Sequence, residues 1–378
     1  MPFSKLGLIP TLTQNLIDSK YDKPYPIQQQ AIPAVIKGKD LLGIAQTGSG
    51  KTAAYVLPIL SILRPRSDDK NRDVDALVLV PTRELAGQVE EVFKTYNFSL
   101  KTPLNINAVF GGVSINPQMK GLFGVHILIA TPGRLLELIR ANALSLSKVK
   151  HLVIDEADKM LNIGFKEEMN EIIKLLPKKR QNLLFSATLS EKVKEINQLV
   201  LTNPIVVKIK PREENLDLIK QEAYYVLEEN KGPLLRYIIK NQNIQQVLIF
   251  TSSKFKADNV AAKLRKHDIQ ATAIHSKKSQ GARTSALRKF KEGSLRVLVA
   301  TDLLARGIDI EFLPFVINYE LPRSPKDFIH RIGRTGRAES PGKAITFVSN
   351  EDELHFKLIQ KKIGKNIEAI DGDRLELI

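Results

Sequence analysis

The stretch 45–52 carries residue types that suit the binding of phosphate groups. It reads Ala-Gln-Thr-Gly-Ser-Gly-Lys-Thr, which matches a phosphate-binding loop except that alanine replaces the first glycine. Small residues let backbone N–H groups wrap phosphate oxygens at the start of a helix, whose dipole favours negative charge. An ordinary glycine-rich turn is the alternative, which the strand and helix expected on either side disfavour. The predicted contacts are Thr47, Gly48, Ser49, Gly50, Lys51 (on the β- and γ-phosphates) and Thr52 (on Mg²⁺).

An apolar run at 152–154 ends abruptly in the carboxylates of Asp155, Glu156 and Asp158. The run predicts a buried strand of a parallel sheet. Acids directly after such a strand need a cationic partner, which is commonly a ligand above the carboxyl ends of the strands. Asp155 would hold Mg²⁺, directly or through water, and Glu156 would orient and deprotonate an attacking water. A solvated loop or helix cap is the alternative, and it suits one acid better than a cluster that complements a phosphate loop.

A third stretch, 330–337, places His330 beside Arg331, Arg334 and Arg337. Phosphoryl transfer spreads negative charge over the γ-phosphate oxygens, and an arginine that neutralises this charge is worth on the order of 10³–10⁵ in rate. A solvated basic turn is the alternative. If Arg334 and Arg337 reach the nucleotide, hydrolysis requires the two halves of the chain to close on it.

Apolar strands alternate with amphipathic helices along both halves of the chain, which predicts an α/β fold with two mostly parallel sheets flanked by helices. The segment 208–217 is charged, contains a proline and has no sustained periodicity. We expect a linker there, between an N-terminal domain of residues 1–207 and a C-terminal domain of residues 218–378. Because only the first half has a phosphate loop, we expect one nucleotide site, shared across the cleft between the domains.

Composition limits the class of protein. The sequence has no cysteine, which excludes disulfides, thiolate metal sites and cysteine nucleophiles. Neither a membrane span nor the apolar core of a signal peptide is evident, so we expect a cytoplasmic protein with no membrane partner. Lysine and arginine total 57 against 41 acidic residues, and the net charge is +16. This excess favours a polyanionic partner, with a generally basic protein as the alternative.

These motifs and their order resemble the DEAD-box family of ATP-dependent RNA helicases, within helicase superfamily 2. The family's name is spelled by the residues at 155–158, and the match covers nearly the whole chain. The other matching motifs are Pro-Tyr-Pro-Ile-Gln at 24–28, the phosphate loop, Pro-Thr-Arg-Glu-Leu-Ala at 81–86, Gly-Gly at 111–112, Thr-Pro-Gly-Arg at 131–134, Ser-Ala-Thr at 186–188, Ala-Arg-Gly-Ile-Asp at 305–309 and the arginine stretch. The resemblance implies two tandem RecA-like domains, ATP and Mg²⁺ as cofactors, and RNA-stimulated ATPase activity. The cysteine-free, lysine-rich and compact chain is most similar to bacterial members of the RhlE type.

The resemblance also implies roles around the adenine base. Gln28 would bind the adenine edge through two hydrogen bonds, Tyr21 would stack on the base, and Phe3 would brace this segment. Ordinary packing is the alternative for the two aromatic residues. Lys20 stands where the family commonly has glycine, and Tyr25 where it commonly has threonine. These two departures bear on adenine recognition and not on phosphate binding.

Further implied roles connect the nucleotide to RNA. Asp158, Ser186 and Thr188 would link the acid cluster to the second domain. Asp309 would contact the ribose hydroxyls, and His330 would help couple the domains. RNA phosphate and 2′-OH contacts would come from Arg83, Gly112, Thr131, Arg134, Ser253, Gly281 and Thr301, with a helix cap or turn as the alternative for the last three. Aromatic residues make up only 6% of the chain and tryptophan is absent, which favours a sequence-independent grip on the backbone over base stacking.

We therefore expect an enzyme that binds ATP·Mg²⁺ and RNA cooperatively in a closed state, bends the RNA and unwinds short duplexes locally. The alternative within the family is an ATP-gated RNA clamp or assembly scaffold with little unwinding. A DNA translocase and a small-molecule kinase are more distant alternatives, and a kinase leaves the second half and the positive charge unexplained. Targeting to a particular RNA is expected to need protein partners.

Overall fold

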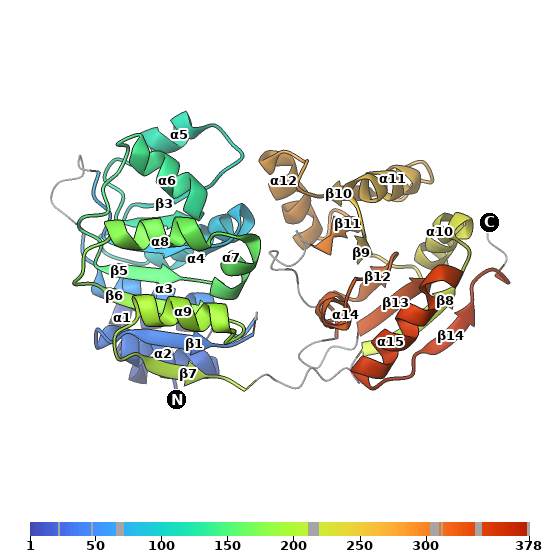
Figure 1. Cartoon of the computed structure of the whole chain (residues 1–378), viewed down its shortest axis with the longest axis horizontal. Helices are drawn as coiled ribbons and strands as arrows, with labels where there is room; N and C mark the ends of the chain where they lie inside the picture. The colour runs from blue at the N-terminus through green and yellow to red at the C-terminus, as the bar shows by residue number, and fades with distance from the viewer. Residues whose placement is uncertain are drawn as a thin grey trace. The chain divides into compact units, whose positions relative to one another are not determined.

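The computed structural model describes residues 1–21, 23–46, 48–65, 72–210, 219–302, 310, 313–336 and 342–375. Thr47, Asp309 and Arg337, which are predicted to bind the nucleotide, lie outside these residues, as does most of the expected linker. The chain divides into two compact units, Met1–Pro211 and Arg212–Ile378. Each unit is built around its own sheet (Figure 1).

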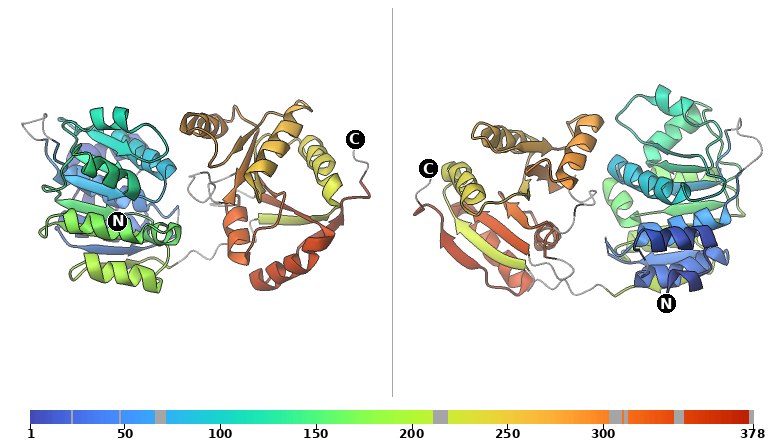
Figure 2. Two further views of the ribbon diagram at one scale, coloured as in Figure 1. Left: turned by 45° about the horizontal axis from the view of Figure 1, so that its top comes forward. Right: turned by 180° about the vertical axis from the view of Figure 1, so that it is seen from behind.

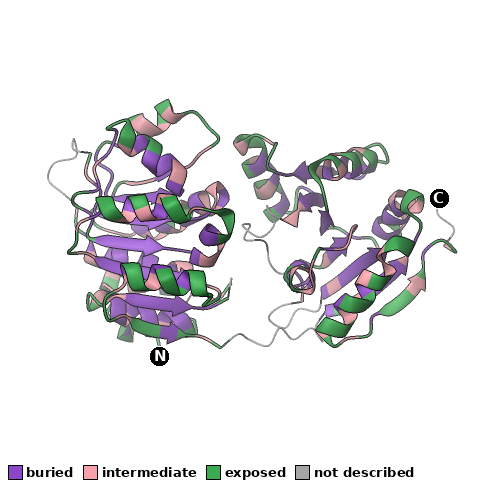
Figure 3. Ribbon diagram, in the orientation of Figure 1, coloured by how far each residue is buried: buried purple, intermediate pink, exposed green. Residues whose placement is uncertain are grey.

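The first unit holds a seven-stranded sheet in the order β3-β4-β2-β5-β6-β1-β7, with every neighbouring pair parallel. Its strands are β1 (Leu41–Ile44), β2 (Ala76–Leu79), β3 (Ile106–Val109), β4 (Ile127–Ala130), β5 (His151–Ile154), β6 (Gln181–Ser186) and β7 (Ile205–Lys208). The central strands are apolar and buried, as expected for a parallel sheet covered on both faces (Figure 3). Lys208, the last residue of β7, pairs with Ile44 of β1, so β7 extends one residue into the segment expected to be a linker.

Helices cover both faces of the first sheet. They are η1 (Phe3–Lys5), α1 (Pro10–Asp18), α2 (Pro26–Ile36), α3 (Lys51–Ile62), α4 (Arg83–Asn97), α5 (Ile115–Lys120), α6 (Pro132–Arg140), α7 (Ala157–Ile163), α8 (Lys166–Leu175) and α9 (Glu191–Val200). One apolar core includes Tyr55 and Phe93 from α3 and α4. A second includes Leu135 from α6 and Met160 from α7. Each core joins strand residues to residues of the following helix, β1 to α3 in one and β5 to α7 in the other. This packing positions the edge of the sheet where these strands end and the helices begin.

The second unit repeats this architecture in the order β10-β11-β9-β12-β13-β8-β14, again with parallel pairs. Its strands are β8 (Ile219–Tyr225), β9 (Val247–Thr251), β10 (Ala271–Ile274), β11 (Val297–Thr301), β12 (Phe315–Asn318), β13 (Gly342–Val348) and β14 (Glu368–Asp371). Its helices are η3 (Glu228–Asn230), α10 (Lys231–Asn241), α11 (Lys254–Arg265), α12 (Gln280–Lys291), α14 (Pro325–Ile332), η4 (Asn350–Asp352) and α15 (Glu353–Ile363). Figure 2 shows helices on both faces of this sheet. The predicted fold of two parallel α/β sheets is confirmed.

No helix within the described ranges is long and apolar enough to cross a membrane.

Candidate nucleotide and catalytic site

The phosphate loop connects the carboxyl end of β1 to the start of α3. Gly48 and Gly50 have φ angles of 78° and 84°, in the left-handed region that glycine adopts without strain. Space also requires glycine at position 50, because a Cβ there would lie 2.5 Å from Nε2 of Gln28. α3 begins at Lys51, so the unpaired N–H groups of its first turn belong to the same loop. The loop has the backbone form of an anion cradle at a helix N-terminus.

Lys51 supplies a desolvated positive charge beside this cradle. Its side chain is 7% exposed, and its Nζ donates hydrogen bonds to the carbonyls of Ala45 (2.6 Å) and Gln46 (2.9 Å). Burial lowers the pKa of Lys51, and the negative charges of Asp155 and Glu156 oppose that shift. The ammonium group is therefore held by the loop's own carbonyls within electrostatic reach of the two acids.

Asp155 is fixed from three directions at the end of β5. Its N–H donates to the carbonyl of Leu79 (2.9 Å), its Oδ2 accepts from Tyr55 Oη (2.9 Å), and its Oδ1 accepts from the Glu156 N–H (2.8 Å). Burial raises the pKa of Asp155, and the charge of Lys51 opposes this. Burial and the nearby Asp155 raise the pKa of Tyr55 well above its usual value, so the phenol stays a hydrogen-bond donor. Sequence reasoning missed Tyr55, although its spacing of four residues from Lys51 places both on one face of α3.

Glu156 has a strained backbone and an unsatisfied carboxylate oxygen. Its φ of 52° and ψ of 47° lie in the left-handed region, which is uncommon for a residue with a Cβ and is often found at functional sites. Its Oε1 accepts a hydrogen bond from Lys159 Nζ (2.7 Å). Its Oε2 is buried and has no hydrogen-bond partner among the residues that the structure describes. Burial raises the pKa of Glu156, with Lys159 opposing. A buried carboxylate with free lone pairs is suited to accept a proton from water.

A short hydrogen-bonded chain joins the acid cluster to the end of β6. Thr188 Oγ1 donates to Asp158 Oδ2 (3.2 Å), and the Ala187 N–H lies 3.5 Å from Asp158 Oδ1. Ser186 Oγ in turn donates to the carbonyl of Thr188 (2.7 Å). Three of the four residues predicted to act in coupling are thus brought together within the first unit, and the fourth, His330, belongs to the second.

The segment predicted to bind adenine is tied directly to the phosphate loop. Gln28 is fully buried, its Oε1 accepts from the Tyr25 N–H (3.0 Å), and its Nε2 donates to the carbonyl of Gly50 (3.0 Å). Tyr21 Oη donates to Gln28 Oε1 (2.9 Å), and burial raises the pKa of Tyr21 to about 12. The ring of Phe3 meets that of Tyr21 edge-on, with centroids 5.3 Å apart. The structure therefore places all three predicted residues in one cluster against the loop.

Lys20 forms the turn that delivers Tyr21 to this cluster. Its φ is 57°, and the N–H of Tyr21 donates to the carbonyl of Leu16 (2.8 Å) across the end of α1. A residue with a Cβ costs roughly 1–2 kcal/mol in this conformation, and the greater unfolded-state freedom of glycine offsets about 0.5–1 kcal/mol of that. The glycine common in the resembling family fits this turn without strain.

We expect Lys20→Gly to increase the free energy of unfolding by roughly 0.5–1 kcal/mol, as the difference of those two effects. Thermal unfolding followed by circular dichroism measures the change. Lys37→Gly is the control, because Lys37 is also an exposed lysine at a helix end but has a φ of −76°. That variant should be destabilised. A Lys20→Gly protein that melts as early as the control would contradict the inferred strain.

The predicted RNA contacts of the first unit gather around the loop at 111–113. Arg83 lies so close to Gly112 that a Cβ on the glycine, whose φ is 80°, would be 2.7 Å from Arg83 Nη1. Arg134 Nη2 donates to the carbonyl of Val113 (2.8 Å), and its Nε donates to Glu137 (2.8 Å). Thr131 is the N-cap residue of the helix that carries Arg134.

In the second unit, Ser253 and Thr301 lie at the same edge of the sheet. Thr301 ends β11 and pairs with Thr251, two residues before Ser253. Ser253 is the N-cap of α11, and its Oγ accepts from the Lys256 N–H (3.2 Å), so the helix cap is present. Gly281 lies in the first turn of α12, where a Cβ would meet open space. Small size is therefore not required at position 281 within this unit.

The arginine stretch separates into buried and exposed positions. His330 is exposed on α14, whereas Arg334, just after that helix, is 8% exposed. Arg331, for which the sequence predicted no role, is buried and bound by several groups. Its Nε and Nη2 pair with both oxygens of Asp302 (2.5 and 2.7 Å), and its guanidinium lies over the ring of Phe250. The sequence offers three arginines and no signal that distinguishes this one.

Comparisons with known proteins agree with this geometry. A family model described as DEAD/DEAH box helicase matches residues 25–196, and one described as helicase conserved C-terminal domain matches residues 230–339. The chain is 38% identical to the ATP-dependent RNA helicase CshA of Listeria monocytogenes, over 98% of this chain and 70% of that protein. It is 40% identical to CshA of Limosilactobacillus reuteri, over 96% and 72%. Among solved structures it is similar to Dbp5 of S. cerevisiae bound to RNA and ADP BeF3, with 31% identity, a TM-score of 0.81 and coverage of 98% of this chain and 96% of that one.

Proposed function

The chain belongs to the DEAD-box family of ATP-dependent RNA helicases, and from this premise we propose that Lys51, Asp155 and Glu156 carry its ATPase reaction. It is an RNA helicase with ATPase activity, and RNA is its partner. One observation supports the assignment of these residues above all. A buried lysine at a glycine cradle lies within electrostatic reach of two buried acids, one of which has an unsatisfied oxygen. The curated relatives carry the name CshA, and the likeness to the RhlE type stays a prediction.

In the proposed reaction, the loop N–H groups bind the β- and γ-phosphates of ATP. Lys51 exchanges the neutral carbonyls of Ala45 and Gln46 for negatively charged phosphate oxygens. These partners stabilise the buried ammonium group more strongly, because a buried charge needs an opposite charge beside it. Glu156 accepts the proton of the attacking water through its free Oε2. Tyr55 keeps Asp155 oriented throughout.

Mg²⁺ would be held by Thr52 and Asp155 and would neutralise charge on the β- and γ-phosphates. The donor set fits a hard cation, because both groups are oxygen ligands and each Asp155 oxygen accepts a single side-chain or backbone hydrogen bond described above. No group of three or more His, Asp or Glu side chains in the described ranges is arranged to hold a metal ion. Nucleotide phosphates and water would therefore complete the coordination, as is usual for Mg²⁺.

The remaining predicted residues have proposed roles on the nucleotide and on RNA. Gln28, Tyr21 and Phe3 would bind adenine, and the Gln28 amide would exchange or share its present partners to do so. Asp309, Arg334 and Arg337 would contact ATP from the second domain, with His330 in coupling. Arg83, Gly112, Thr131, Arg134, Ser253, Gly281 and Thr301 would contact the RNA backbone. We also propose domain limits of 1–207 and 218–378, and a cytoplasmic location consistent with the cysteine-free composition.

Unwinding is best separated from clamping by a strand-displacement assay. A short RNA duplex with a fluorescent strand is mixed with the protein, with and without ATP. We expect ATP-dependent release of the strand, because ATP and RNA bind together to a closed state in which the RNA strand is bent. The second strand cannot stay paired with a bent strand and is released. RNA-stimulated ATP hydrolysis with no strand release would instead favour an ATP-gated clamp. Equal stimulation by DNA of the same sequence would favour a DNA translocase.

A further inference from the structure

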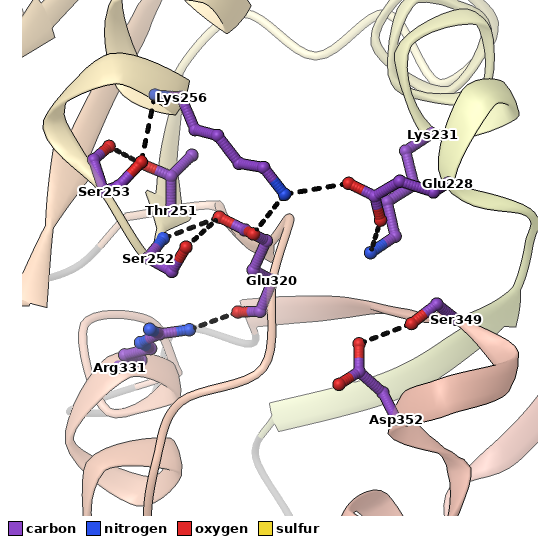
Figure 4. Close-up of polar contacts among 10 residues, drawn as sticks. All are labelled: Glu228, Lys231, Thr251, Ser252, Ser253, Lys256, Glu320, Arg331, Ser349 and Asp352. Atoms are coloured by element: carbon purple, nitrogen blue, oxygen red, sulfur yellow. Dashed lines mark hydrogen bonds and ion pairs between the residues drawn. The ribbon is translucent and has the colours of Figure 1, made fainter.

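Glu320, two residues after the end of β12, joins three elements of the second unit (Figure 4). Its Oε2 accepts hydrogen bonds from both the N–H and the Oγ of Ser252, each at 2.7 Å. Its Oε1 accepts from Lys256 Nζ at 2.6 Å, and its backbone carbonyl accepts from Arg331 Nη1 at 2.6 Å. The Glu320 side chain is 14% exposed. A carboxylate suits this position because both of its oxygens must accept.

These contacts hold the turn on both sides of Ser253. Ser252 precedes it, and Lys256 closes the first turn of α11 by donating its N–H to Ser253 Oγ (3.2 Å). The Ser253 carbonyl accepts from Thr251 Oγ1 (3.3 Å), which fixes the backbone of the turn as well. Because Ser253 Oγ serves the helix as an acceptor, its hydroxyl proton can be donated to a phosphate oxygen.

The charge of Glu320 is matched within the cluster. Burial alone would raise the pKa of Glu320, but the hydrogen bonds from Lys256 and Ser252 outweigh it and hold the pKa below its usual value. Lys256 also pairs with Glu228 (2.8 Å) on η3. The carboxylate is therefore ionised yet paired, and it can lie beside an RNA site without presenting an uncompensated negative charge.

The same network reaches the second predicted RNA contact at this edge. Arg331, which binds the Glu320 carbonyl, pairs with both oxygens of Asp302, and Asp302 directly follows Thr301. The turn at Ser253 and the strand end at Thr301 are thus linked through the contact between Glu320 and Arg331. Both lie at the carboxyl edge of neighbouring strands β9 and β11.

We propose that Glu320 is a positioning residue for RNA binding, which holds the turn at 252–253 so that the Ser253 hydroxyl and the end of β11 bind the phosphate backbone together. This inference rests on the proposed RNA contacts of Ser253 and Thr301. It assigns Glu320 no contact with RNA or ATP of its own.

Glu320→Gln in the full chain tests the proposal. Glutamine keeps the size of the side chain, but only one of its two polar atoms can accept, so either Ser252 or Lys256 faces a donor. We expect the KM for RNA in the RNA-stimulated ATPase assay to rise about ten-fold, the effect of losing roughly one charge-assisted hydrogen bond. The kcat at saturating RNA should stay within about two-fold of wild type, because ordering a binding surface affects affinity and not the chemical step.

Glu228→Gln is the matched control. This substitution removes the carboxylate that pairs with Lys231 and Lys256 in the same cluster. Glu228 does not bind Ser252, so the KM for RNA should not change. Ser252→Ala, which removes only the hydroxyl donor, should raise the KM by a smaller factor and serves if Glu320→Gln does not fold. An unchanged KM in Glu320→Gln, an equal rise in the control, or tighter RNA binding would each overturn the proposal. The KM for RNA can be measured only if RNA stimulates the ATPase of the wild-type protein. A wild-type ATPase that RNA does not stimulate would overturn the proposed RNA contacts themselves.

Discussion

Replacement of Glu156 by glutamine is expected to slow ATP hydrolysis by about 10²–10⁴-fold, the usual contribution of a positioned general base. The amide cannot take a proton from water, whereas its shape preserves the packing of the original side chain. ATP and RNA binding should persist, because Lys51, the loop and the RNA-contact residues are unaltered. Phosphate release under steady-state conditions measures the rate, and titration with a fluorescent ATP analogue measures binding.

Glu167→Gln provides the comparison for this variant. Glu167 is an exposed acid in the first turn of α8 of the same unit, so its replacement should leave turnover at the wild-type rate. Wild-type turnover in Glu156→Gln would exclude Glu156 as the base. Loss of ATP binding in that variant would instead indicate a structural role through the bond to Lys159.

Lys51→Met is expected to weaken ATP binding by roughly 30-fold to more than 1,000-fold, as a loss of about 2–5 kcal/mol predicts for one partner of a buried charge pair. Methionine fills similar space but supplies no charge to the phosphates. It also removes the cation that most opposes the burial-driven rise in the pKa of Asp155. Hydrolysis should be lost along with binding.

Nucleotide titration of Lys51→Met, with circular dichroism to establish folding, measures this effect. Lys37→Met is the control, because Lys37 is an exposed lysine at the end of α2 and its replacement should leave ATP affinity unchanged. Unaltered ATP affinity in Lys51→Met would show that the nucleotide binds elsewhere.

The local geometry of the candidate site could be predicted because its signals are local. The spacing of Gly48, Gly50 and Lys51 specifies a backbone shape and a helix start by itself. The apolar run before Asp155 likewise predicts a buried strand with acids at its end. Both fold units followed from the alternation of apolar strands and amphipathic helices.

What the sequence did not reveal depends on long-range packing. Tyr55 reaches Asp155 only because α3 packs over the sheet that carries β5, a contact between residues 100 apart. Arg331 takes its place through Asp302, Phe250 and the Glu320 carbonyl, which only the fold brings to it. The short edge strand β14 escaped prediction because its residues are mostly exposed and leave no apolar pattern.

Coupling between the ATP and RNA sites is tested most directly by the ATPase rate of the unaltered chain at saturating ATP, with and without single-stranded RNA of mixed sequence. RNA should favour the state in which ATP is hydrolysed, since each ligand stabilises the conformation that binds the other. We expect RNA to raise the rate by about ten-fold or more, the size of a coupling free energy near 1.4 kcal/mol or above. Equal rates with and without RNA would contradict the coupling.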